Sequence, residues 1–161
     1  MTTIVQSITH TDYSINIKFN NGHHISCRIS EYGKCCEIFG LYVMSNKKNV
    51  SDELDNFVYK ELIDIDLVYN LYHTHNIYEN EGDDVIETFA KKTINVQDKT
   101  VSLVQERFKN PVVRLTFKDE PYPLDIVLYN QHNGYYPHNC WIVIDLMMNG
   151  YAMSEKIKYD I

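Results

Sequence analysis

Apolar and polar residues alternate along several short stretches of this chain, which is the pattern of β-strands that bury one face. The clearest case is Tyr13–Phe19, where Tyr13, Ile15, Ile17 and Phe19 lie on one face and polar residues on the other. Similar patterns predict strands at Thr3–Thr9, His23–Ser30, Leu41–Met44, Asp64–His75, Thr100–Phe108 and Val112–Lys118. Because these strands mostly follow one another directly, the pattern favours an antiparallel sheet.

The loop after Tyr13–Phe19 can be chosen from the hydrophobic pattern of its two flanking strands. A two-residue loop would place apolar residues of one strand beside polar residues of the next. A three-residue loop pairs Ile17 with Ile25 and Ile15 with Cys27, so that apolar residues share a face. We therefore predict a three-residue loop that ends at Gly22 with a positive φ.

Two stretches have the spacing of short helices. In Ser51–Ile63, Leu54, Phe57, Val58 and Leu62 form one face behind a suitable N-cap serine. In Asp84–Lys92, an acidic first turn precedes a short apolar face. The sequence thus predicts an α+β protein, a mostly antiparallel β-sheet with two short helices packed on one side, as a single domain over residues 1–161.

Composition and charge disfavour some classes of binding partner. The chain has 161 residues, a net charge of −7 and only three arginines, Arg28, Arg107 and Arg114. A nucleic-acid partner is disfavoured by this charge, because phosphate backbones are bound by basic surfaces. No apolar run is long enough to span a membrane. The four cysteines, Cys27, Cys35, Cys36 and Cys140, do not form a disulfide framework, and no export signal is apparent, so we expect an intracellular protein with reduced thiols.

The stretch Tyr129–Leu146 concentrates the residues that could build a site. It joins two apolar runs through a connection with two histidines, two adjacent tyrosines and the only tryptophan. A polar, aromatic loop between strands is a common position for a binding site. Tyr135 and Tyr136 could line a cleft or cap the sheet, and both interpretations remain open.

Metal binding is the sharpest chemical alternative. His73 and His75 are two residues apart on a predicted strand, so both imidazoles could face one zinc or iron ion. His132 and His138 flank the loop of the central stretch and would complete the site if the two strands formed a hairpin that paired them. Neither histidine pair matches a strong metal-ligand motif, and the alternative is that these histidines bond loop backbone or lie in solvent.

Two short elements resemble a domain of unknown function found in phages and large DNA viruses. They are Cys35-Cys36-Glu37 followed by Phe39-Gly40, and His132-Asn133-Gly134-Tyr135-Tyr136-Pro137-His138. The resemblance implies a small virus-encoded α+β domain in which both elements share one site. It also implies the host cytoplasm as location, and it brings no activity with it. The ligand-binding residues that follow from it are Cys36, Glu37, His132, Asn133, Gly134, Tyr135, Tyr136 and His138.

We therefore expect a binding protein rather than an enzyme, without a cofactor. Its loop-built cleft would hold a small or nucleotide-like molecule, or a segment of a host protein. The alternative is a metal-dependent hydrolase that uses His73, His75, His132 and His138.

Overall fold

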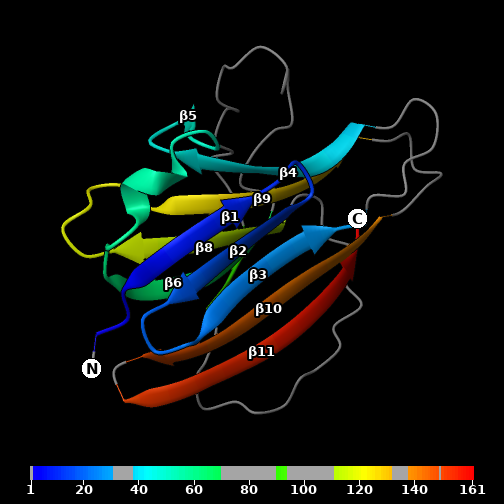
Figure 1. Ribbon diagram of the computed structural model, residues 1–161. Helices are drawn as coiled ribbons and strands as arrows, with labels where there is room; N and C mark the ends of the chain where they lie inside the picture. Colours follow the sequence, from blue (N-terminus) through cyan, green and yellow to red (C-terminus); the bar gives the residue numbers. More distant parts are fainter. Residues whose placement is uncertain (1, 31–37, 70–89, 94–110, 132–137, 149) are drawn as a thin grey trace.

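Two antiparallel sheets stacked face to face form the described part of this computed structural model (Figure 1). The structure describes residues 2–30, 38–69, 90–93, 111–131, 138–148 and 150–161. The first sheet has the order β1 (Val5–His10), β2 (Ser14–Phe19), β3 (His24–Ile29), β10 (Asn139–Met148) and β11 (Tyr151–Asp160). The second has the order β5 (Lys48–Asn49), β4 (Ile38–Ser45), β9 (Leu124–Gln131), β8 (Pro111–Phe117), β6 (Leu62–Tyr69) and β7 (Ala90–Thr93).

The core lies between the two sheets and is filled by alternate residues of both. This arrangement follows from the period of two, since every second side chain of a strand points to the same face. The first sheet contributes, among others, Ile15, Ile17, Phe19, Ile25, Cys27, Ile142 and Ile144. The second contributes Val43, Ile65, Leu67, Val113, Leu115 and Ile126.

The outer faces of the two sheets differ. The second sheet buries a further apolar cluster on its outer face, made of Tyr42, Met44, Val68, Val112, Val127 and Tyr129. The outer face of the first sheet is polar, and residues such as Asn16 and Arg28 are exposed there. Polar chemistry that could meet a ligand is therefore found on the first sheet.

The three-residue loop between β2 and β3 is confirmed. Ile17 pairs with Ile25 and Ile15 with Cys27, while the amide of Phe19 donates to the carbonyl of His23 over 2.9 Å. Gly22 has a φ of 81°. The hydrophobic pattern of the two strands was thus sufficient to determine this register.

The prediction of a mostly antiparallel sheet is confirmed, but the helix at Ser51–Ile63 is wrong. The structure has only a 3-10 turn, η1 (Leu54–Phe57), and Leu62 already begins β6. The backbone between η1 and β6 instead forms hydrogen bonds with the start of the chain. The amide of Tyr59 donates to Val5 over 2.8 Å, and the amide of Leu62 donates to Thr3 over 2.8 Å. These long-range hydrogen bonds use amide groups that a helix at Ser51–Ile63 would need, so that helix does not form.

Two further expectations need correction. The helix predicted at Asp84–Lys92 is wrong at its end, because residues from Ala90 onward form strand β7 and pair with β6; its earlier residues, and the strand predicted at Thr100–Phe108, lie outside the described residues. The element that covers the first sheet is the second sheet, and not a pair of helices. Within the described ranges, no helix has the length and apolar character that crossing a bilayer requires.

The two strands of the central stretch do not form a hairpin. β9 pairs with β4 and β8 in the second sheet, whereas β10 pairs with β3 and β11 in the first. Asn130 faces Phe39, and Cys140 faces Ile29. The chain therefore crosses between the sheets here, because both β9 and β10 find better apolar partners elsewhere.

Replacing Gly22 by alanine tests the loop. The substitution should lower the free energy of unfolding by about 1 kcal/mol, because a residue with Cβ is strained at positive φ. A new Cβ would meet no atom within 4 Å, so the loss would come from the backbone alone. The measurement is the urea midpoint, and an unchanged midpoint would contradict the strain.

Burial should make Cys27 inert in the folded protein. Its side chain is fully buried, and this desolvation raises the pKa of the thiol from 9.0 to about 12. We expect maleimide labelling of native Cys27 to be about a thousandfold slower than that of a free thiol, because the thiolate is the reactive form. Peptide mass spectrometry before and after unfolding measures this. Rapid labelling of Cys27 without unfolding would show that the site is open to solvent.

Candidate ligand-binding site

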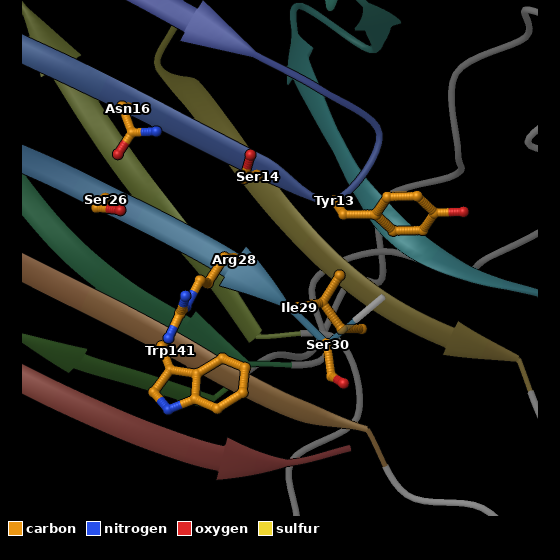
Figure 2. A pocket seen from close by; sticks show the side chains of 8 residues that line it. All are labelled: Tyr13, Ser14, Asn16, Ser26, Arg28, Ile29, Ser30 and Trp141. Carbon is orange, nitrogen blue, oxygen red and sulfur yellow. The ribbon is translucent and has the colours of Figure 1, made fainter. Parts of the chain in front are cut away.

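An open hollow lies on the outer face of the first sheet, over β2, β3 and β10 (Figure 2). Its volume is about 790 Å³, which is within the range of small-molecule sites. The side chains that line it are Tyr13, Ser14, Asn16, Ser26, Arg28, Ile29, Ser30 and Trp141. Most of these carry a hydroxyl, amide or guanidinium group, so the hollow offers hydrogen-bond donors and acceptors.

The strand register lines up the main polar residues of the hollow. Ser14 pairs with Arg28, Arg28 with Trp141, and Trp141 with Lys158, so that one cross-strand row runs over β2, β3, β10 and β11. Directly opposite residues of an antiparallel pair share a face. We call Ser14, Arg28, Trp141 and Lys158 the cation row.

A cation stacks on the only tryptophan of the chain. Cζ of Arg28 lies 4.4 Å from the centroid of the Trp141 ring, and Nζ of Lys158 lies 5.9 Å from the same centroid. Both distances are within the range of cation–π attraction. The ring covers one side of the guanidinium while Arg28 remains exposed, so the N–H groups that point away from the ring stay open to solvent.

Within the described part of the chain, no carboxylate pairs with the Arg28 guanidinium. Arg114 on the second sheet shows the contrast, because its Nε and Nη2 donate to the two oxygens of Asp125 over 2.8 and 2.9 Å. The half-buried Arg114 is thus paired with a buried carboxylate, whereas the exposed Arg28 lies against an aromatic ring.

A second row adds neutral polar groups beside the cation row. Asn16 pairs with Ser26 across β2 and β3, and Ser26 pairs with Val143 on β10. The hydroxyl of Ser14 lies 3.0 Å from that of Thr11 in the preceding turn. The hollow therefore combines one fixed cation with several neutral donors and acceptors.

His138 is the one predicted site residue that the structure describes, and it is buried rather than open. Only 3% of its surface is exposed. Its ring stacks on Phe39 with centroids 3.9 Å apart, and its Nδ1 donates to the carbonyl of Ser30 over 3.2 Å. Its backbone exchanges two hydrogen bonds with Ile161. These contacts make His138 part of the framework in this structure.

The flanks of the two predicted site elements meet at one end of the sandwich. Ile38, which follows Glu37, pairs with Gln131, which precedes His132. Ser30, at the entrance of residues 31–37, receives the Nδ1 hydrogen bond of His138. We call this region the loop end. Because Ser30 and Tyr13 also line the hollow, the hollow reaches the loop end.

Close backbone packing fixes the loop end. The amide of Leu41 donates to the carbonyl of Asp12 over 2.7 Å, which ties the β1–β2 turn to β4. A Cβ on Gly40 would lie 2.7 Å from the same oxygen, so only glycine permits this approach. Tyr13 packs on Phe39 with ring centroids 5.4 Å apart. The rings of Tyr13, Phe39 and His138 therefore connect both sheets at this end.

The remaining predicted residues lie outside the described part of the chain. They are Cys36, Glu37, His132, Asn133, Gly134, Tyr135 and Tyr136 of the ligand site, and His73, His75 and His132 of the zinc or iron alternative. Among the described residues, no group of three or more histidine, cysteine and acidic side chains is placed to hold a metal. The hairpin that was to pair His132 with His138 is not formed, so the predicted metal geometry loses that support.

Sequence reasoning missed the hollow itself. Arg28 stood out only as one of three scattered arginines, and Trp141 only as part of the central stretch. The correct β2–β3 register already places Ser14 beside Arg28 on the polar face. The contact between Arg28 and Trp141 depends on the pairing of β3 with β10, and no local pattern specifies that pairing.

Comparison with known proteins gives no relative: no family model matches the chain, and neither a curated protein nor a solved structure matches it. The resemblance to a viral and phage family therefore stays a prediction.

Replacing Phe39 by leucine tests the ring contacts at the loop end. We expect a loss of about 1–2 kcal/mol in unfolding free energy, because two ring contacts are removed while most of the apolar volume remains. The matched control is Tyr59→Leu, because the Tyr59 side chain is 82% exposed. That control should change stability by less than about 0.5 kcal/mol. Equal urea midpoints for both variants would contradict a structural role for the Phe39 ring.

Proposed function

We propose that the protein is a binding module that holds a small ligand in the hollow on the outer face of the first sheet. One observation carries the proposal. Arg28 is exposed and has no carboxylate partner among the described residues, yet it is stacked on Trp141 at the edge of the hollow. A cation that is restricted in orientation and left without a counter-charge is suited to bind an incoming group.

The surroundings of Arg28 support the same function. Asn16, Ser26 and Ser30 line the hollow with short polar side chains, which fix the orientation of a ligand without filling the space. All three sit on β2 and β3 or directly after β3, whose inner residues are fully buried in the core. A site mounted on such strands needs little reorganisation when a ligand binds.

The hollow adds to the site expected from the sequence and does not replace it. Ser30 lines the hollow, and it directly precedes the segment that contains Cys36 and Glu37. Binding by those residues, a viral origin, a location in the host cytoplasm and a host protein segment as partner remain proposals. A metal-dependent hydrolase is not favoured by any contact of the described residues.

The test measures whether a ligand occupies the hollow and whether a bulky side chain placed there prevents binding. Trp141 is the only tryptophan, so its fluorescence reports on the site. We expect members of a panel of nucleotides, sugar phosphates, dicarboxylates, amino acids and sugars to change this fluorescence saturably. Native mass spectrometry should show a copurifying ligand of the same class. Ser26→Phe should abolish both signals, because the new ring would occupy the space between Arg28 and Asn16.

The matched control is Ser7→Phe. Ser7 lies on the outer face of the same sheet, opposite Lys18 on β2, and does not line the hollow. It should leave binding unchanged. The proposal fails if no ligand in either assay is sensitive to Ser26→Phe, or if Ser7→Phe has the same effect.

A further inference from the structure

We infer that the ligand of the hollow is a nucleotide-sized organic phosphate whose phosphate group is bound by Arg28. The inference rests on the proposed function and specifies its ligand. Three observations support it: the contact of Arg28 with Trp141, the positive charge near that contact and the size of the hollow.

The first observation is that the exposed Arg28 guanidinium lies against the Trp141 ring. Because Cζ of Arg28 lies over the Trp141 ring, 4.4 Å from its centroid, the guanidinium can donate hydrogen bonds to a ligand only on the sides that the ring leaves uncovered. An edge of this group presents two parallel N–H donors, and that spacing matches two oxygens of a phosphate or carboxylate. The Trp141 ring thus restricts the position of these two N–H donors before a ligand binds, which lowers the entropic cost of binding.

The second observation is the local charge. The chain as a whole carries a net charge of −7, but Arg28, Lys156 and Lys158 lie together on the outer face of β3 and β11. Within the described residues, none of the three has an acid partner. Lys158 approaches the same ring as Arg28, with its Nζ 5.9 Å from the centroid. Two cations at one ring suit a phosphate, which carries nearly two negative charges at neutral pH, better than a carboxylate.

The third observation is the size of the hollow. A volume of about 790 Å³ leaves room beside a phosphate group for the body of a nucleotide-sized ligand. That body would meet Ser26 and Asn16, which offer a hydroxyl and an amide, and the Trp141 ring also lines the hollow. A nucleoside has the hydroxyl groups and the flat ring that such a surface can bind.

A long nucleic-acid strand fits less well. The affinity of a strand comes from neutralising many phosphates, and a chain with a charge of −7 would repel most of its backbone. The cation row supplies two positive charges, Arg28 in the lining of the hollow and Lys158 beside the Trp141 ring, which is enough for one phosphate group. We therefore commit to a single nucleotide-sized molecule, and binding of a strand alone is an outcome that contradicts the inference.

The experiment titrates the folded protein with matched probes and follows Trp141 fluorescence, with calorimetry as a second readout. The probes are the four ribonucleoside monophosphates, their nucleosides, ribose 5-phosphate, inorganic phosphate and a single-stranded oligonucleotide of about ten residues. We expect at least one nucleoside monophosphate to bind about tenfold or more tightly than its nucleoside, which is the typical effect of charge-assisted hydrogen bonds. Inorganic phosphate should compete weakly, and added salt should reduce affinity.

Variants separate the roles of charge and geometry. Arg28→Ala should weaken binding of the monophosphate about tenfold or more and leave binding of the nucleoside unchanged. Arg28→Lys should give an intermediate affinity, because it retains the charge and loses the fork. The control is Lys18→Ala, which removes the same charge from the outer face of the same sheet, opposite Ser7 on β1 and outside the hollow. It should change affinity by no more than about twofold. Thermal midpoints of all variants verify folding.

The outcomes distinguish this inference from the proposed function. If Ser26→Phe abolishes binding of an uncharged or cationic ligand, and no phosphate probe binds, the hollow is a binding site and the inference on its ligand is wrong. Equal affinity for nucleoside and monophosphate, or no effect of Arg28→Ala, also overturns the inference. So does tight binding of the oligonucleotide without any binding of the single nucleotides. If no probe of any class is sensitive to Ser26→Phe, both proposals fail.

Discussion

The packing of two sheets against one shared core is the constraint on which the structure depends. Ile15, Cys27 and Ile142 lie on adjacent strands of the first sheet and are fully buried against the second sheet. A shift of any one strand by a single residue would turn its buried side chains to solvent and bury its polar ones. The core therefore determines the register of the first sheet, and the register determines which polar residues meet on its outer face. The cation row is a direct consequence, because Ser14, Arg28, Trp141 and Lys158 are paired neighbours in this register.

The two sheets use arginine in opposite ways. On the second sheet, Arg114 is locked to Asp125, itself buried, and the neighbouring outer face is covered with apolar side chains. The buried Asp125 needs such a partner, because an unpaired charge in a low-dielectric interior is costly. On the first sheet, Arg28 remains in contact with water and rests on an aromatic ring instead. Exposure lowers the cost of an unpaired charge, so Arg28 tolerates having no carboxylate partner among the described residues. The loop end connects both sheets through Tyr13, Phe39 and His138, and it brings the flanks of the predicted site elements beside the hollow.

Strands with a local apolar pattern could be predicted from the sequence. The β2–β3 register could also be predicted, because it depends only on one turn and the two short strands beside it. The errors arose where distant residues decide the structure. Leu54, Phe57, Val58 and Leu62 have helical spacing, but the backbone after η1 bonds to Thr3 and Val5, which lie far away in the sequence. The strands on either side of residues 132–137 looked like a hairpin, but β9 and β10 pair with other strands in separate sheets. The hollow escaped prediction for the same reason, since Arg28 and Trp141 meet only through the pairing of β3 with β10. Of the predicted site residues, His138 alone is described, and its stack on Phe39 could not be seen from spacing.

The central claim is that the ligand binds on Arg28 and Trp141. Nuclear magnetic resonance tests it most directly, because a ¹⁵N-labelled sample has a single tryptophan indole signal, that of Trp141. During titration with a nucleoside monophosphate, this signal and the backbone amides of Ser26 and Arg28 should shift together along one saturation curve, while the amides of β6 and β8 stay in place. If the indole signal does not move at saturation, or if the largest shifts fall on the second sheet, the ligand binds elsewhere and the account is wrong.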